Sequence, residues 1–442
     1  MSALSAMSRT ERRSLKDHLR DRPKLSAAWC IVAAFGTYAC MYGLRKPFTA
    51  AGYEAPPFGP GFKAFLVMSQ VLGYTLSKWM GIRIIAEMQP SQRTATLLGL
   101  VAAAEVSLVL FGWVPTPYNG VLLFLNGLAL GLVFGLVLGF LEGRQLTEAL
   151  VAALCASFIV ADGVTKSAGL ALLEAGISER WMPATCGAFF LLPLTGFVWM
   201  LRKIPSPSPA DIAARSERTP LDRAGRRAFL ARYAPGLILI ILAYLLITVM
   251  RSLRADFAPE LWSGLGTRGQ PAIFTTSELW VALGVLSVNG LASTVRDNRR
   301  AFFLALAICG AGLLMVGGAI AGHRTGRIGA FPFMVLFGLG LYLPYVAVHT
   351  TIFERLIALT RERGNVGHLM YVADAVGYLG YLAVMFAKWR WTADSDFLPQ
   401  FLQLGGAGAT ISLVALLLAA LFFARVRYPA APVLRVAPLG TA

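Results

Sequence analysis

Charged residues are scarce in this chain of 442 residues, where Asp, Glu, Lys and Arg make up only 14% of the sequence. A soluble globular domain contains about 25% of such residues. Histidine and cysteine are also rare, with four and five copies, and no Cys-x-x-Cys pair or His/Cys cluster has metal-ligand spacing. A Gly-Lys-Ser/Thr nucleotide loop is absent as well. We therefore expect no disulfide framework, no metal site, no cofactor, no ATP-driven pump and no enzyme.

What the chain has instead is apolar sequence: 57% of its residues are hydrophobic and the mean hydropathy is +0.64. A membrane-spanning helix needs about 20 consecutive, mostly apolar residues. Twelve segments meet this requirement: 25–50, 61–82, 94–113, 119–141, 147–173, 182–201, 235–257, 276–295, 300–321, 329–352, 366–387 and 399–424. The predicted fold class is an all-α integral membrane protein with twelve transmembrane helices.

Basic residues give the predicted orientation. The net charge of +17 comes from arginines and lysines that gather on one side of the predicted spans, as the positive-inside rule describes. We therefore predict that residues 1–24, the long hydrophilic linker 202–234 and the tail 425–442 are cytoplasmic, and that the basic residues contact anionic lipid rather than nucleic acid. The N-terminus lacks the pattern of a cleavable signal. The expected location is the plasma membrane, or the inner membrane in a bacterium.

The linker at 202–234 divides the spans into an N-terminal half, 25–201, and a C-terminal half, 235–424. Two six-helix halves joined by one cytoplasmic linker are the layout of a major facilitator, in which the halves rock around a site near the middle of the bilayer. The first span of each half also ends in cations, Arg45-Lys46 and Arg251 to Arg254. Cations at membrane depth cost about 2.5–3.5 kcal/mol on insertion scales, which indicates an anionic partner or a water-filled path. Snorkelling to lipid headgroups is the alternative interpretation.

Four motifs resemble the organophosphate:phosphate antiporters of the major facilitator superfamily, which include the bacterial glycerol-3-phosphate and hexose-phosphate transporters. They lie at 42–48 (YGLRKPF), 73–81 (GYTLSKWMG), 250–259 (MRSLRADFAP) and 377–380 (GYLG). The resemblance implies an exchanger that holds the phosphate of its substrate with one arginine from each half, Arg45 and Arg251. Guanidinium groups suit this task because they offer planar, bidentate donors.

The resemblance gives Lys46 and Lys78 secondary roles at the same site. Inward stripes of helical spacing add further polar side chains. The substrate-binding candidates are Arg45, Arg251, Lys46, Lys78, Tyr42, Tyr74, Asp162 and Tyr378, and the candidates for coupling or gating are Lys166, Arg254, Asp256, Asp374, Glu105 and His349. For each tyrosine taken alone, helix packing or an interfacial belt remains the alternative.

The fifth span departs from the family, because it has Asp162 where the family has a histidine that contacts substrate. Asp162 and Lys166 are four residues apart, a spacing that favours an ion pair on one helix face. Pairing of Asp162 with Lys78 or with an arginine of the pocket is the alternative. Glu105 and Glu278 are further carboxyl groups within spans, for which proton coupling or a bond to a neighbouring helix is expected. Gly127, Gly131 and Gly135 recur every four residues, which is typical of close helix packing.

We therefore predict a secondary transporter that exchanges or imports a small phosphorylated or otherwise anionic metabolite by alternating access, with inorganic phosphate as the exchange partner that the resemblance implies. One alternative is a proton-coupled symporter of another organic anion, which would use Asp162, Asp374 or Glu105. Another is a transporter-like membrane sensor of a sugar phosphate. The expected partners are the small anionic substrate, with inorganic phosphate or protons, and the lipid bilayer; the protein is expected to be a monomer.

Overall fold

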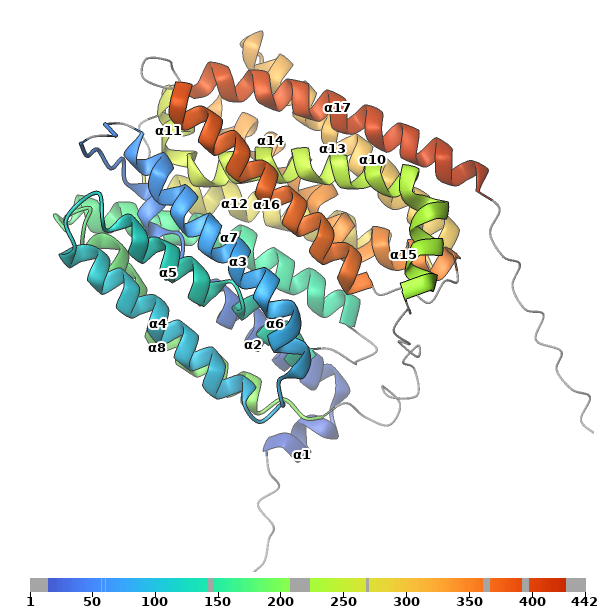
Figure 1. Cartoon of the computed structure of the whole chain (residues 1–442), viewed down its shortest axis with the longest axis horizontal. Coiled ribbons are helices and arrows are strands. Elements are labelled where there is room, and N and C mark those ends of the chain that lie inside the picture. The colour runs from blue at the N-terminus through green and yellow to red at the C-terminus, as the bar shows by residue number, and fades with distance from the viewer. Residues whose placement is uncertain are drawn as a thin grey trace, which may run out of the picture.

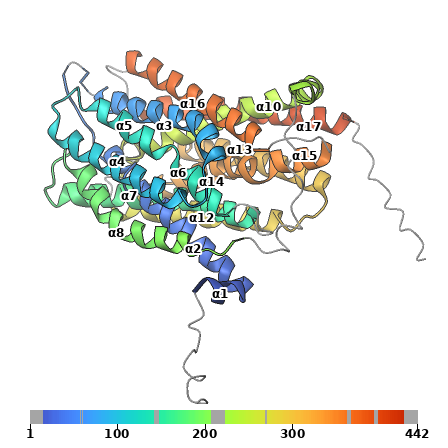
Figure 2. The same cartoon turned by 60° about the horizontal axis from the view of Figure 1, so that its bottom comes forward.

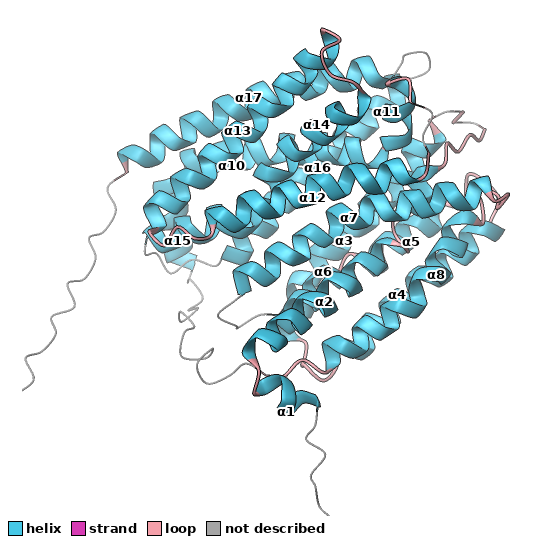
Figure 3. Ribbon diagram, turned by 180° about the vertical axis from the view of Figure 1, so that it is seen from behind, coloured by secondary structure: helices cyan, strands magenta, loops and turns pink. Residues whose placement is uncertain are grey.

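The computed structural model describes residues 15–56, 58–59, 61–141, 147–206, 223–267, 270–360, 366–391 and 397–426. Within these ranges the chain is built of helices joined by short loops, and no strand is present in them (Figure 3). The first part of the chain forms α1 (Leu15–Arg20), α2 (Pro23–Tyr42), the short 3₁₀ helix η1 (Pro47–Ala50), α3 (Phe62–Glu87), α4 (Arg93–Trp113), α5 (Gly120–Leu130), α6 (Val133–Leu141), α7 (Thr147–Glu174) and α8 (Met182–Arg202).

The second part contains the remaining helices. It consists of α10 (Arg223–Asp256), α11 (Ala258–Gly264), α12 (Ala272–Ala292), α13 (Asn298–Arg324), α14 (Ala330–Ala347), the π-helical turn η2 (Val348–Ile352), α15 (Phe353–Thr360), α16 (Val366–Trp391) and α17 (Phe397–Arg425). Two of the spans are interrupted. α5 and α6 together form one span, and α14, η2 and α15 form another. The result is twelve membrane-crossing segments, six in each part, as the sequence predicts.

Ten of these segments are long and apolar enough to cross a membrane by length and composition alone. The other two are α3, which has 26 residues, and α16, whose apolar part is the shorter stretch Val372–Ala387. Both have charged residues inside the span, Lys78 in α3 and Asp374 in α16. Charged and polar residues lower the hydropathy of these two spans, whereas α7 and α10, which also carry buried charges, remain apolar enough overall.

The two halves lie side by side in Figure 1, where the blue-to-green half contains α2 to α8 and the lime-to-red half contains α10 to α17. They pack against each other along two seams, α7 against α12 and α3 against α16. Figure 2 shows the second of these seams, with α3 next to α16. These two seams are where long helices of one half meet long helices of the other.

Glycines allow the closest helix contact within the first half, between α3 and α5. A Cβ on Gly127 would lie 2.0 Å from the carbonyl oxygen of Gln70, and a Cβ on Gly73 would lie 2.0 Å from that of Phe124. Gly131 continues the row against Ser77. The predicted packing role of Gly127 and Gly131 is confirmed, because no larger residue fits between these backbones.

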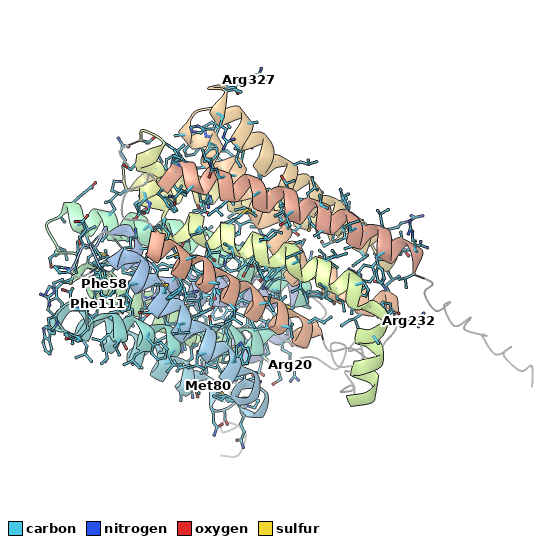
Figure 4. All side chains as sticks on the ribbon, turned by 45° about the horizontal axis from the view of Figure 1, so that its top comes forward. Arg20, Phe58, Met80, Phe111, Arg232 and Arg327 are labelled. Carbon is cyan, nitrogen blue, oxygen red and sulfur yellow. The ribbon has the colours of Figure 1, made fainter. Side chains whose placement is uncertain are left out.

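The ends of the bundle can be followed in Figure 4, where Phe58 and Arg327 lie toward one end and Arg20 and Arg232 toward the other. Arg20 precedes the first span and Arg232 lies near the start of α10, so both are on the side that the charge pattern predicts to be cytoplasmic. Helix α10 begins at Arg223, twelve residues before the predicted boundary at 235, so part of the predicted linker is helical.

Candidate functional site

The first helix breaks just before its two cations. α2 ends at Tyr42, and residues 43–46 form a turn that leads into Pro47 at the start of η1. Proline has no N–H and disfavours helical geometry in the residue before it, so the helix cannot continue through this point. Two side-chain amides donate hydrogen bonds to carbonyl groups of this turn. Gln70 Nε2 donates to the Arg45 carbonyl at 2.8 Å, and Asn126 Nδ2 donates to the Leu44 carbonyl at 3.1 Å.

This turn places Arg45 and Lys46 deep inside the protein, with only 4% and 7% of their surfaces exposed. Snorkelling requires a side chain that reaches the membrane surface, and these two do not reach it. The predicted continuous span 25–50 is thus shorter as a helix than expected. Its last residues are a buried turn that presents cations to the interior.

The Arg45 guanidinium rests on tyrosines. Its Cζ atom lies 3.8 Å from the centre of the Tyr74 ring and 5.5 Å from that of Tyr42. Such cation–π contacts contribute about 0.5–2 kcal/mol and hold the group without neutralising it. Arg45 makes no ion pair with any described residue, and its Nε has no hydrogen-bond partner there.

Arg251 of α10 repeats this arrangement in the second half. Its Cζ lies 4.3 Å from the Tyr345 ring centre and 5.9 Å from that of Tyr342, and Nη2 donates to the Ser252 hydroxyl at 3.3 Å. Arg251 is 8% exposed. It also lacks an ion-pair partner among the described residues, and its Nε is unbonded within them. Each half therefore supplies one buried, stacked and uncompensated guanidinium.

The neighbouring lysines, in contrast, are paired. The Lys46 ammonium bonds Asp256, the last residue of α10, and the Tyr381 hydroxyl donates to the other oxygen of that carboxylate at 2.7 Å. Near the same end, Lys63 of α3 bonds Glu260 of α11 at 2.5 Å. Both pairs join the first half to the second, at the end of the bundle where α2 and α10 end.

A third pair between the halves lies further along α3. Lys78 bonds Oδ2 of Asp374 in α16 at 2.6 Å, and the Tyr244 hydroxyl donates to Oδ1 at 2.5 Å. His349 Nε2 is 3.4 Å from the same Oδ1 and belongs to the π-helical turn η2. Such turns are frequent at functional positions. Lys63 and Lys78 are fifteen positions apart, or about 22 Å along the helix axis. Their ion pairs therefore join the two halves at two different depths.

Two further pairs stand behind the arginines. Lys166 Nζ bonds Oδ2 of Asp162 at 2.5 Å within α7, so the ion pair predicted from the spacing is confirmed. Pairing of Asp162 with Lys78, the alternative, does not occur because Lys78 is bound to Asp374. Arg254 Nη1 bonds Glu278 of α12 at 2.7 Å, and Nη2 donates to the Met334 carbonyl at 3.0 Å.

Two adjoining chambers separate the charged pairs. The first, here called the arginine chamber, has an empty volume of about 380 Å³ and is lined by Tyr42, Arg45, Lys46, Val71, Phe158, Asp162, Arg251, Ser252, Ala255, Asp256, Tyr342, Tyr378 and Tyr381. The second, the Lys78 chamber, has about 360 Å³ and is lined by Tyr38, Tyr42, Tyr74, Lys78, Phe134, Phe158, Arg251, Tyr345, His349, Asp374 and Tyr378. Tyr42, Phe158, Arg251 and Tyr378 border both.

The structure therefore brings most of the predicted site residues to one place. All eight substrate-binding candidates line one chamber or both, and among the coupling or gating candidates Asp256, Asp374 and His349 do so. Lys166 lies behind Asp162, and Arg254 is turned toward Glu278. Glu105 lines neither chamber; it is half-buried between α4 and α8, where a Cβ on Gly187 would lie 2.1 Å from its Oε2.

Sequence reasoning missed several contributors. Asn126 supports the turn of Arg45, and the signal that could have found it is an amide within the apolar stretch Leu123–Leu130. Phe158 borders both chambers, but one phenylalanine in an apolar helix gives no such signal. The bond between Lys63 and Glu260 joins residues 197 positions apart. No local pattern indicates which acid such a lysine finds.

The chemistry of the two chambers is that of an anion site. Five cations (Arg45, Lys46, Lys78, Lys166 and Arg251) and three carboxylates (Asp162, Asp256 and Asp374) line the chambers or pair with their lining, so the formal charge is two positive units. Tyrosine hydroxyls add donors and acceptors around a small volume. Charge of this kind, removed from water, attracts an anion far more strongly than the same charge at a surface.

Comparison with known proteins gives the family and the fold. The family model described as "Family of unknown function (DUF5690)" matches residues 47–426. No curated protein matches the chain in sequence. Three solved transporters are similar in structure: a D-xylose-proton symporter (TM-score 0.58, 16% identity, covering 90% of this chain and 97% of that one), the POT family transporter PepTSo (0.59, 14%, 90% and 98%) and the nucleoside transporter NupG (0.57, 14%, 90% and 100%).

These likenesses confirm the predicted fold, twelve transmembrane helices in the two halves of a major facilitator. At such low identity they carry no information on substrate. The narrower resemblance to organophosphate:phosphate antiporters stays a prediction, which only the residues of the chambers support.

Proposed function

The chain belongs to DUF5690, a family of unknown function, and we propose that it is a secondary transporter that moves a small phosphorylated metabolite across the membrane in exchange for inorganic phosphate. In this proposal Arg45 and Arg251 bind the phosphate from opposite sides. The four motifs that resemble the organophosphate:phosphate antiporters support it, and so does the charge of the chambers.

One observation carries the proposal: the two arginines have no carboxylate partner among the described residues, whereas Lys46, Lys63, Lys78, Lys166 and Arg254 all have one. A buried charge without a partner is costly, so a protein retains it where a ligand supplies the compensation. Two such charges from two halves, bordering one cavity, suit a dianion. A phosphate group has the right charge and enough oxygens for two forked donors.

The three pairs between the halves suggest how binding and movement are linked. In this proposal Lys46–Asp256 and Lys63–Glu260 form the closure at one end of the chambers, and Lys78–Asp374 forms the closure at the other end. Lys46 and Asp256 border the arginine chamber itself. A bound dianion competes with Asp256 for the Lys46 ammonium, which weakens one closure while the other holds. This is alternating access with the substrate as the trigger.

A second function has an observation of its own. A polar cluster at the second closure consists of His349, Asp374, Lys78 and Tyr244. Histidine and aspartate side chains take part in the proton relays of many transporters. In a proton-coupled symporter this cluster would carry the proton while the arginines bind another organic anion. Asp162 remains a further candidate for the proton, whereas Glu105 is remote from the chambers.

Counterflow in proteoliposomes distinguishes these functions. Vesicles that contain the purified protein are loaded with unlabelled phosphate, and uptake of labelled phosphate is followed with organic phosphates, carboxylates or neutral sugars as competitors. We expect rapid exchange that organic phosphates inhibit and neutral sugars do not. Exchange that collapses when the pH gradient is removed would favour the proton-coupled symporter. Vesicles that exchange no phosphate but accumulate carboxylates would refute phosphate as the ligand.

A further inference from the structure

Three carboxylates border the chambers, and one of them has an oxygen to spare. Asp256 uses both oxygens, one for Lys46 and one for Tyr381, and Asp374 bonds Lys78 through Oδ2 and Tyr244 through Oδ1. Asp162 is 4% exposed and lines the arginine chamber, but only its Oδ2 is bonded, to Lys166. Its Oδ1 has no hydrogen-bond partner in the described part of the chain.

An unsatisfied buried acceptor is costly, and a ligand recovers that cost if it brings a donor. The two arginines that share the chamber with Asp162 can only donate hydrogen bonds, and an ionised carboxylate can only accept them. A ligand that satisfies all three must therefore be an anion that also carries a proton. Lys166 balances the charge of Asp162 but leaves this requirement for a donor unchanged.

We propose that Asp162 is a specificity-determining residue that accepts a hydrogen bond from a protonated oxygen of the bound oxyanion. The inference rests on the proposed function, since it takes an anion between Arg45 and Arg251 as given. Hydrogen phosphate carries one O–H at neutral pH and satisfies Asp162, whereas a phosphate monoester satisfies it in its singly protonated form or through a hydroxyl of its organic part. Sulfate has the same shape and charge but no proton, so it places a bare oxygen against the carboxylate. The site selects for the proton of the ligand as well as for its negative charge.

The test compares equilibrium binding of labelled phosphate and labelled sulfate to the purified full-length protein at one neutral pH. One hydrogen bond to a charged group is worth enough to give wild type a preference for phosphate of about 10- to 100-fold. In Asp162→Asn the amide can donate as well as accept, so sulfate binding should improve until the two affinities agree within about threefold. The ratio of affinities is the measurement.

Asp256→Asn is the matched control. It removes one negative charge from the same chamber, but both oxygens of Asp256 are already bonded within the protein. We expect it to change phosphate and sulfate binding by similar factors and to leave their ratio near that of wild type. Asp162→Asn also strands the buried Lys166 ammonium, so Asp162→Asn/Lys166→Met is a second variant, checked for folding by size-exclusion chromatography.

The outcomes separate the two ideas. A wild type that binds phosphate and sulfate equally well would overturn the role of Asp162 and leave phosphate transport standing. Equal changes of the ratio in Asp162→Asn and Asp256→Asn would show that charge, rather than hydrogen bonding, decides, which overturns the inference as well. If wild type binds neither anion, the proposed function fails first and the inference falls with it.

Discussion

Lysine at position 45 or 251 would keep the positive charge of the site and remove the planar fork of N–H donors. Both arginines are more than nine-tenths buried and neither pairs with a described carboxylate. A substitution there leaves no acid without its partner, so we expect the protein to fold and insert almost as wild type does. The loss should appear in anion binding.

The magnitude follows from the burial of the two groups. A charge-assisted contact in a desolvated site is worth on the order of 2–5 kcal/mol, or about 30-fold to several thousand-fold in affinity. The shorter contact of Arg45 with Tyr74, 3.8 Å against 4.3 Å for Arg251 and Tyr345, indicates that Arg45 is held more firmly before the anion binds. We therefore expect Arg45→Lys to lose at least as much affinity as Arg251→Lys.

Binding of labelled phosphate to the purified variants and counterflow in proteoliposomes are the two assays. The double variant should lose less than the sum of the two single losses, because an anion already missing one fork has less to lose from the other. Arg93→Lys is the control, since Arg93 donates to the Gly139 carbonyl and lines neither chamber. Near-wild-type binding in both single variants would refute the two-arginine site.

Three other changes test the packing, the closures and the orientation. Gly127→Ala forces a Cβ against the α3 backbone and should lower the free energy of unfolding by about 1–3 kcal/mol, seen as a lower melting temperature. A Cβ at Gly99 would have no heavy atom within 4 Å, so Gly99→Ala should be neutral or slightly stabilising. Neutralising either Lys78 or Asp374 should stop exchange, because the other charge loses its partner. The charge swap Lys78→Asp/Asp374→Lys should restore part of the exchange. A swap that is no more active than the single variants would contradict the role of this ion pair in closure. A cysteine at Ser216, outside the described residues, should react with impermeant reagents only from the cytoplasmic side, and labelling from outside intact cells would reverse the predicted topology.

The fold was predictable from composition because twelve apolar stretches of the right length leave few other arrangements. The interruptions were not. Gly131 stands at the first break, and Pro344 and His349 stand at the second, but such residues also occur in continuous spans and so do not predict a break by themselves. The break at Gly43 is different, because Pro47 predicts that the helix ends before it and the two cations indicate that this end is buried.

For the site, the sequence could name residues but could not pair them. Asp162 and Lys166 are four positions apart in one helix, so local geometry alone predicts their bond. Lys46 and Asp256 are 210 positions apart, and Lys78 and Asp374 are 296 apart. Which acid each lysine meets depends on how the two halves pack, and a single sequence contains no direct record of that packing.

The three ion pairs found between the halves in the described residues share a polarity, because each lysine comes from the first half and each acid from the second. Two copies of the first half, placed face to face, would oppose lysine to lysine, and two copies of the second would oppose acid to acid. Repulsion between like charges therefore disfavours pairing of two identical halves, and the ion pairs favour pairing of the first half with the second. The halves, if produced as two separate polypeptides, should find each other in a one-to-one complex. The charge pattern of the seams thus specifies which half pairs with which, even without the linker that joins them.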